Sequence, residues 1–343
     1  MKPHRRVSMQ TIADRLGLSK YAVSRALSGK SGVSEETRRR VLAEARNLGY
    51  RLPRRTRPED QAEPSHSGYI LIWMDASIQQ EGSYWGRILR GIAAACAEEG
   101  WQFAVVTPSL QGELLIPTYM ERSSCIGHIA LGKLPTEFML SLHASGMPAV
   151  LVDHEEPAME ADEILNANIE GGMLLFRHLH AQGCRRIVFV GNELFASSFK
   201  ERWIGCRLAA EELHSEEDPV RLRKWTIPYA QHRWTDELHL RLHAMTSEPL
   251  PDAFICANDD IALSLMGLLK ARGFSIPEQV SVAGFDNIDA AAMSVPPLTT
   301  VDLAKEALGS RAVEQLSRRQ TFPGARTEKI LLAPRLIMRE SVK

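Results

Sequence analysis

The run 10-QTIADRLGLSKYAVSRALSGKSGVSEETRRRVLAEARNLGYRLP-53 decides the fold of the amino-terminal part of the chain. Its apolar residues recur in three groups at helical spacing. Gly17 stands where a first helix needs a left-handed C-cap, and Ser19 and Ser34 are suitable N-caps for a second and a third helix. Two short helices joined by 16-LGLS-19 and closed by a third helix predict a helix-turn-helix unit.

The second of these helices, roughly Lys20 to Leu27, is expected to lie in a major groove of DNA. Its apolar residues are needed for packing, which leaves the polar ones for contact. Arg25 is the best candidate for reading guanine, because a guanidinium can donate twice to O6 and N7. Tyr21 offers a ring that stacks on or bonds to a base, and serines here would meet phosphate. The predicted contacts of this unit are Thr11, Ser19, Lys20, Tyr21, Ser24 and Arg25.

The distribution of charge supports a polyanionic partner for this unit. The whole chain of 343 residues carries a net charge of −1. Residues 1–57 hold 15 basic and 4 acidic side chains, a balance of +11, so the remainder holds 26 and 38, a balance of −12. A basic head on an acidic body favours contact between the head and nucleic acid. A solvated basic tail is the alternative that charge alone leaves open.

From Gly68 onward, strand-like apolar runs alternate with amphipathic helix-like segments. The expected strands are 68–75, 102–107, 127–131, 149–153, 186–191, 253–257 and 279–285. The expected helices between them include 89–99, 173–182, 208–213 and 261–271. Continuous apolar runs are typical of buried parallel strands, and the alternation predicts a doubly wound α/β fold. There are too many strands for one compact sheet, so we expect two similar subdomains.

Polar side chains stand at the carboxyl ends of several expected strands, where ligands bind in open α/β sheets. These residues are Asp75, Asp153, Asn258 and Asp286. Carboxylates and amides suit a neutral polyhydroxyl ligand, because they accept from or donate to its hydroxyl groups. Three aromatic residues could offer faces to a ring, with packing in a core or a dimer interface as the alternative. They are Tyr84, Trp85 and Tyr229.

Motifs for catalysis, metals or nucleotides are not predicted. The run 127-GHIALGKL-134 nearly spells a P-loop, but Leu134 replaces the hydroxyl that would hold Mg²⁺. His239 and His243 lack the acid of a zinc helix, so a solvated helix face is expected for them. The pair Asp259–Asp260 is expected to cap a helix. We therefore expect no enzyme activity, no catalytic or metal-ligating residues and no cofactor.

The cysteines and the hydropathy indicate a reduced compartment. The five cysteines are scattered and no pair has CxxC spacing, so structural thiols are expected. No apolar run approaches the ~20 residues of a membrane span, and the amino terminus lacks an apolar signal region. A cytoplasmic protein without a membrane contact is expected.

The amino-terminal run resembles the headpiece of the lactose-repressor (LacI/GalR) family of bacterial regulators. The family's recognition-helix V-S-R stands at 23–25, its V-S-x-x-T-R-x-x-V at 33–41, and 49-GYRLP-53 follows. Ala22 and Ser28 depart from the usual Thr and Asn. The body is similar too, through 257-ANDDIA-262, 284-GFDN-287, 296-PPLTTV-301 and 334-PRLIMRES-341. The resemblance covers nearly the whole chain.

The resemblance implies an all-α headpiece followed by a periplasmic-binding-protein-like core of two doubly wound subdomains. The expected divisions are a headpiece at 1–57, a linker or degenerate hinge at 58–67, and a core at 68–343. Within the core, the first subdomain would comprise about 68–163 plus 302–322, and the second about 164–301 plus 323–343. The chain would cross between them three times, with the last strand returning to the second.

The resemblance also implies a function. The expected protein is a sequence-specific transcriptional regulator, a repressor of a carbohydrate-utilisation operon, that binds a near-palindromic operator as a homodimer. A sugar or sugar derivative would bind between the subdomains. Arg202, Asn258 and Asp286 match the family's ligand contacts, and Asp153 and Ser198 fall on weaker matches. Other members bind nucleosides or nucleobases, or respond to a protein. A solute-binding protein and an α/β enzyme with a regulatory head are the alternatives from other classes.

The stretch after the headpiece departs from the family. There, relatives form a hinge helix that wedges an apolar residue into the minor groove. An ungapped match from Pro53 places Arg57 and Asp60 on the family's Ala and Leu positions, with Pro58 between them. An acid is a poor wedge near phosphates, so we expect weaker operator bending. The arginines just before it, Arg51, Arg54 and Arg55, are still expected to contact DNA.

Overall fold

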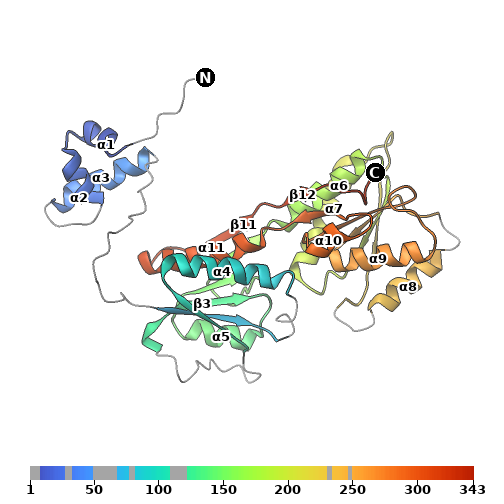
Figure 1. The fold of residues 1–343 in the computed structure, drawn as a ribbon, viewed down its shortest axis with the longest axis horizontal. Helices are drawn as coiled ribbons and strands as arrows, with labels where there is room; N and C mark the ends of the chain where they lie inside the picture. The colour runs from blue at the N-terminus through green and yellow to red at the C-terminus, as the bar shows by residue number, and fades with distance from the viewer. Residues whose placement is uncertain are drawn as a thin grey trace. The chain divides into compact units, whose positions relative to one another are not determined.

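The computed structural model describes residues 8–27, 33–48, 68–76, 82–108, 122–229, 234–245 and 249–343. The chain divides into two compact units, Met1–Ser65 and His66–Lys343. Figure 1 shows the helices of the first unit in blue and the two sheets of the second.

The first unit contains three helices around a small apolar core. They are α1 (Met9–Leu16), α2 (Lys20–Leu27) and α3 (Glu35–Asn47). Gly17 ends α1 with a φ of 64°, as the sequence predicts. The Oγ atom of Ser19 accepts from the backbone N–H of Ala22 at 3.1 Å, and that of Ser34 accepts from Thr37 at 3.2 Å. The core residues are Ile12, Ala13, Val23, Ala26, Val41 and Ala45.

The second unit begins with an all-parallel sheet in the order β11-β5-β4-β3-β1-β2. Its strands are β1 (Tyr69–Met74), β2 (Gln102–Val106), β3 (Cys125–Leu131), β4 (Ala149–Val152), β5 (Asp162–Asn166) and β11 (Lys329–Leu332). A short 3-10 helix, Arg122–Ser124, precedes β3. Helices α4 (Trp85–Glu99) and α11 (Lys305–Thr321) cover one face of this sheet, and α5 (Thr136–Ala144) covers the other (Figure 1). Apolar side chains fill both interfaces.

The second sheet has the order β12-β10-β9-β8-β6-β7. Its strands are β6 (Arg186–Val190), β7 (Arg221–Trp225), β8 (Ala253–Cys256), β9 (Ser281–Phe285), β10 (Thr299–Asp302) and β12 (Arg335–Ile337), of which only β12 is antiparallel to its neighbour. Its helices are α6 (Asn168–Ala181), α7 (Ser197–Leu213), α8 (Trp234–Ala244), α9 (Asp259–Ala271) and the short α10 (Asp289–Met293). One large apolar core joins these elements.

The chain crosses between the two sheets three times, and each crossing is short. The crossings follow β5, β10 and β11. The expectation that 323–343 lies wholly in the second subdomain is wrong, because β11 pairs in parallel with β5 of the first sheet. The first subdomain also extends to Asn166 rather than 163, since β5 ends there.

Candidate functional site

The predicted DNA contacts of α2 lie on its outer side. Val23 and Ala26 face the core, whereas Lys20, Tyr21 and Ser24 are exposed. The guanidinium of Arg25 lies over the ring of Tyr21, with its carbon 5.4 Å from the ring centre, and donates to the Tyr21 hydroxyl. The helix therefore presents a positive charge and an aromatic ring together, one turn apart.

Two of the predicted contacts have local structural duties as well. The hydroxyl of Thr11 lies 3.1 Å from that of Ser8 in the capping box of α1, and Ser19 caps α2. Both residues are exposed and lie in the first turn or at the cap of a helix. A phosphate could therefore approach these hydroxyl groups and the backbone N–H groups beside them, which favour an anion. Arg51, Arg54 and Arg55, with the linker 58–67, lie outside the described residues.

The first subdomain contributes a partly buried polar cluster at the carboxyl ends of its strands. Tyr84 precedes α4, and its hydroxyl donates to Oδ2 of Asp153 at 3.1 Å. The amide of Asn166, at the end of β5, donates to the Tyr84 hydroxyl at 3.1 Å and to Asp153 Oδ1 at 3.4 Å. Tyr84 packs against the apolar cores of both subdomains, so this cluster lies where they meet.

Burial changes the proton affinity of this cluster. It raises the pKa of Asp153 to about 6, and the guanidinium of Arg202 and the Tyr84 hydroxyl partly oppose the rise. Burial, with the nearby charges of Asp153 and Asp286, raises the pKa of the Tyr84 phenol well above its usual value. Asp153 has a φ of 57°, a left-handed backbone conformation that costs free energy in a residue other than glycine. Contacts of its side chain must offset that cost. Strain combined with a shifted pKa is typical of functional positions.

The second subdomain contributes Arg202, which is only 3% exposed. Its guanidinium donates from Nε to Asn168 Oδ1 at 3.0 Å and from Nη1 to the carbonyl oxygen of Ala257 at 2.6 Å. Nη2 lies 3.2 Å from Oδ1 of Asp286, and the group stands over the ring of Phe285 at 4.9 Å. A buried charge with this many partners is held in one orientation.

Two buried acceptors in these clusters retain capacity for a ligand. Oδ1 of Asn166 and Oδ1 of Asp286 each lack a hydrogen bond within the part of the chain that is described. The contact of Asp286 with Arg202 satisfies an ion-pair distance but not hydrogen-bond geometry. Buried acceptor atoms normally accept a hydrogen bond. Two donor groups of a bound molecule could supply the hydrogen bonds that these two oxygens lack.

Aromatic side chains border the second cluster. The rings of Phe195, Phe199 and Trp234 lie 4.9, 5.5 and 5.4 Å from that of Tyr229. The Tyr229 hydroxyl accepts from Asn258 Nδ2 at 2.7 Å. Tyr229 therefore connects an aromatic wall to a residue that stands at the carboxyl end of β8.

The expectation for the acidic pair at the start of α9 is wrong. Asn258 caps this helix, because its Oδ1 accepts from the backbone N–H of Ile261 at 3.0 Å. Asp259 is fully buried instead: it accepts from the Thr300 hydroxyl at 2.6 Å and from the Ile288 N–H at 3.0 Å. Asp259 thereby connects β10 to the loop that carries Asp286. Asn258, as a cap, has both ends of its amide engaged.

We expect Asp259→Asn to change the pH dependence of stability. Burial raises the pKa of Asp259 to about 8, against an unfolded value of about 4. Between about pH 4 and pH 8 the folded state therefore keeps the proton of Asp259, whereas the unfolded state has lost it. The stability that the protonated carboxyl contributes is full below about pH 4 and is lost as pH rises to about 8. An asparagine reproduces the neutral acid, with Nδ2 donating to Thr300. In melts across pH, the variant should match the wild type below about pH 4 and exceed it by an amount that grows up to about pH 8.

The control for this experiment is Asp289→Asn, an exposed aspartate in α10. Its melting curve should keep the wild-type slope with pH. Parallel slopes for Asp259→Asn and the wild type would contradict the assignment of a buried, protonated Asp259.

The short crossing 166–168 contacts both clusters. Asn166 bonds to Tyr84 and Asp153, while the amide of Asn168 accepts from Arg202 and donates to Glu201 Oε2 at 3.0 Å. The next crossing is fixed by Lys305, a fully buried ammonium that donates to the carbonyl oxygens of Asp286 and Leu303. Both crossings therefore end in residues that position the candidate ligand contacts.

The other three predicted contacts differ in burial and surroundings. Trp85 packs edge-on against Tyr84 and belongs to the core of the first subdomain, as the packing alternative expected. Ser198 is half-buried in the first turn of α7, and Asp75 is half-buried directly after β1. Sequence reasoning did not select Asn166, Asn168 and Lys305, although the short segment 162-DEILNAN-168 places two amides between a strand and a helix.

Two family models match the chain. Residues 8–52 match the model described as bacterial regulatory proteins, lacI family, and residues 176–342 match a periplasmic binding protein-like domain. The chain thus combines a lacI-family helix-turn-helix unit with a periplasmic-binding-protein-like domain. It is accordingly a DNA-binding transcriptional regulator with a helix-turn-helix unit and a two-sheet α/β core.

Relatives of this family align over nearly the whole chain. The transcriptional repressor PurR of Haemophilus influenzae is 26% identical over 344 residues, which cover 98% of each chain. The transcriptional regulator GalR of Lacticaseibacillus casei is 28% identical over 337 residues, 96% of this chain and 98% of that one. The structure of the regulator CelR in complex with cellobiose superposes with a TM-score of 0.64 at 24% identity, over 98% and 100% of the two chains.

The described residues contain neither a candidate metal centre nor a membrane helix. No group of three or more His, Cys, Asp or Glu side chains in those ranges could hold a metal ion. No helix in them is long and apolar enough to cross a bilayer.

Proposed function

We propose that this regulator is a repressor whose effector is a small neutral polyhydroxyl molecule, a sugar or a sugar derivative. The observation that supports this most directly is the pair of buried acceptors, Oδ1 of Asn166 and Oδ1 of Asp286. They come from the two sheets, so one ligand with donors on both sides would bind both subdomains. Hydroxyl groups of a sugar supply such donors without adding charge.

The charge balance of the site favours a neutral ligand. The guanidinium of Arg202 is already surrounded by Asp286, the Asn168 amide and the Ala257 carbonyl. An anionic ligand would compete with Asp286 and lie close to Asp153, and the repulsion in a buried site would be strong. The proposed contacts are Asp153, Asn166, Arg202, Tyr229, Asn258 and Asp286, with Tyr84 at the junction and Asp75 and Ser198 at the periphery.

A nucleoside is the second candidate for the effector. The aromatic wall formed by Phe195, Phe199, Tyr229 and Trp234 supports it, because a planar base stacks well on aromatic rings. A base also presents the donors that the two acceptors would receive. A protein co-regulator is the third expectation that the sequence leaves open.

The effector would act by changing the relative populations of two arrangements of the subdomains. A ligand shifts such an equilibrium only through a difference in its affinity for the two states. The crossing 166–168 is the segment through which ligand contacts and subdomain orientation are coupled, since it bonds to both clusters. As a homodimer on a near-palindromic operator, the regulator would place two α2 helices about one DNA turn apart. Its site of action would be the cytoplasm, where operator DNA is found.

A thermal-shift screen over neutral sugars, sugar phosphates and nucleosides tests the effector class. A ligand at 100 times its Kd adds about 2.7 kcal/mol of stability. We expect a neutral sugar to raise the melting temperature of the wild type and to leave that of Asn166→Ala unchanged. If only nucleosides raised the melting temperature, a nucleoside would replace a sugar as the proposed effector. If neither neutral sugars nor nucleosides raised it, both proposals would be contradicted.

Arg25→Ala tests the DNA-binding role. Loss of a bidentate contact to guanine should weaken binding to the cognate operator by about 1–3 kcal/mol and relax specificity at one base position. Affinity measured across operators with single base changes gives both quantities. Arg15→Ala is the matched control, because Arg15 is exposed in α1 and pairs with Glu44 at 3.0 Å. An equal loss on every sequence would instead assign Arg25 to a phosphate.

A further inference from the structure

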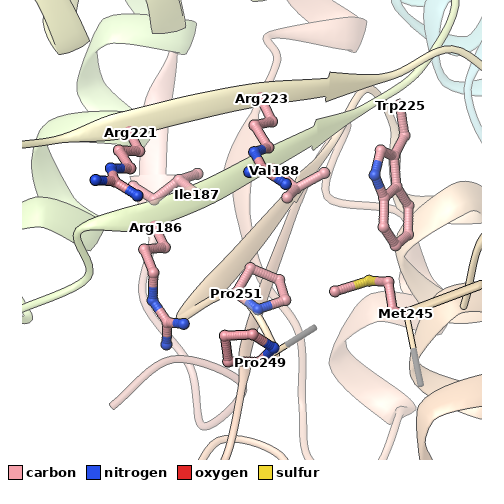
Figure 2. Close-up of a pocket in the computed structure, with 9 residues that line it drawn as sticks. All are labelled: Arg186, Ile187, Val188, Arg221, Arg223, Trp225, Met245, Pro249 and Pro251. Carbon is pink, nitrogen blue, oxygen red and sulfur yellow. The ribbon is translucent and has the colours of Figure 1, made fainter. Parts of the chain in front are cut away.

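A cavity of about 300 Å³ opens on the second sheet, away from the effector contacts. Strands β6 and β7 form one wall, and residues that follow α8 form another, including Met245 and Pro251 (Figure 2). Such a volume is at the lower end of the range for small-molecule sites. Nothing in the proposed function uses this cavity.

One end of the cavity is strongly cationic. Arg186 of β6 and Arg221 of β7 stand directly opposite each other in the sheet, and Arg223 is opposite Val188. Alternate residues of a strand face the same side, so Arg221 and Arg223 both point to the cavity, as Figure 2 shows. Like charges directly opposite each other are destabilising, so this arrangement calls for an anion.

The protein's own acids only partly supply that anion. Asp252 pairs with Arg186 at 2.6 Å, but its other oxygen accepts from the backbone N–H groups of Arg185 and Arg186 at 2.9 and 2.8 Å. Its capacity is therefore taken. Arg221 is exposed, and its guanidinium has no ion pair with any acid in the described ranges.

The other end of the cavity is apolar and aromatic. Trp225 stands on the same face of β7 as Arg221, four residues further on, which corresponds to about 13 Å along a strand. Its ring packs on Phe254 with a centre-to-centre distance of 5.1 Å and borders the cavity beside Met245. Figure 2 shows Trp225 and Met245 together at one end and the guanidinium groups of Arg186 and Arg221 at the other.

Protection of a sheet edge explains some of the arginine residues that line the cavity, but not the whole set of lining residues. Strand β7 lies at the edge of the second sheet, and positive side chains on edge strands prevent pairing with other chains. That role needs no concave surface, no tryptophan and no arginine on the neighbouring strand β6. The cavity brings all three together.

We propose that this cavity binds a small phosphorylated molecule with a planar apolar group. The phosphate would be held by Arg221, whose guanidinium can donate to two phosphate oxygens, and by Nη1 of Arg186, because Nε and Nη2 of Arg186 already donate to Asp252 Oδ1. The planar group would lie against Trp225, in contact with Met245 and Pro251. This site would make the regulator responsive to a second ligand that is chemically distinct from the neutral effector.

The experiment is calorimetric titration of the full chain with phenyl phosphate, inorganic phosphate and benzyl alcohol. We expect saturable binding of phenyl phosphate, weaker binding of inorganic phosphate and none of benzyl alcohol. Arg221→Gln should weaken phenyl phosphate by about tenfold or more, the value of a hydrogen bond to a charged group. Arg207→Gln, an exposed arginine of α7 paired with Glu211, is the control and should bind as the wild type does.

Trp225→Leu separates the two ends of the site. We expect this variant to bind phenyl phosphate no better than inorganic phosphate, with the affinity for inorganic phosphate unchanged. The basic headpiece also attracts phosphates, but every variant retains it, so only differences between variants are interpreted. Equal phenyl phosphate affinity in the wild type and in Arg221→Gln would overturn the proposal, as would wild-type-like discrimination in Trp225→Leu. The second comparison holds even if Arg221→Gln does not fold.

Discussion

Arg202→Met is expected to lower the free energy of unfolding by about 3–5 kcal/mol, because it leaves Asp286 buried without its countercharge. The Asn168 amide and the Ala257 carbonyl would lose their donors as well. Methionine retains the packing volume of the side chain, so the loss reports the charge rather than a cavity. Chemical denaturation measures the change, and effector titration should show no response at any concentration at which the wild type saturates.

The matched control is Arg207→Met on the same helix, an exposed residue in an i,i+4 pair with Glu211. Surface pairs of this kind contribute little, so stability should change by less than about 0.5 kcal/mol. The double variant Arg202→Met/Asp286→Asn adds a second check, since asparagine tolerates the φ of 103° at this position. It should regain part of the lost stability, because the unpaired carboxylate is gone. A double variant less stable than Arg202→Met would show that the cost has another source.

Gly205→Ala is expected to destabilise the protein by about 3 kcal/mol, at the upper end of the range for an overpacked core. Helices α6 and α7 cross at this residue, and a Cβ atom would lie 2.1 Å from the carbonyl oxygen of Ile169. Because backbone cannot rotate away as a side chain can, the two helices must separate. Arg202 lies one turn away on α7, so its contact with Asn168 should lengthen and effector affinity should fall together with stability.

Gly267→Ala provides the comparison for this variant. Gly267 lies in α9, and nothing stands within 4 Å of the position that its Cβ atom would take. Alanine is a better helix former than glycine, so this change should raise stability by about 0.5–1 kcal/mol. A neutral Gly205→Ala would show that the crossing of α6 and α7 is not closely packed at this residue.

The sequence predicts the elements that carry strong local signals. The headpiece helices follow from Gly17, Ser19 and Ser34, which act as caps in the structure as expected. The seven long apolar strands are present, with ends that differ by one or two residues. The five strands that were not predicted lack a continuous apolar run or are very short. Strand β5 begins with two acids, 221-RLRKW-225 alternates charge at an edge, β10 and β11 carry polar residues, and β12 has three residues. Their pairing is decided by tertiary contacts rather than by local pattern.

Residues of the candidate site could be predicted from the sequence where a polar residue directly follows an apolar strand. Asp153, Asn258 and Asp286 lie at such ends in the structure, and their ligand contacts remain predictions. Asn166 was missed because β5 begins with two acids and does not read as a buried strand. The role of Asp259 was also beyond the sequence, since its partner Thr300 lies 41 residues away along the chain.

Asn166 and Asn168 are separated by a single residue, Ala167, yet their amides contact different subdomains. In the proposed mechanism, the two clusters of ligand contacts are therefore joined by two residues of chain, or about 7 Å when extended. Neither amide can be displaced by much without pulling on the other through the covalent backbone. Under this proposal, the two clusters are coupled directly through the backbone, and variation elsewhere in the core can alter ligand preference while this connection persists.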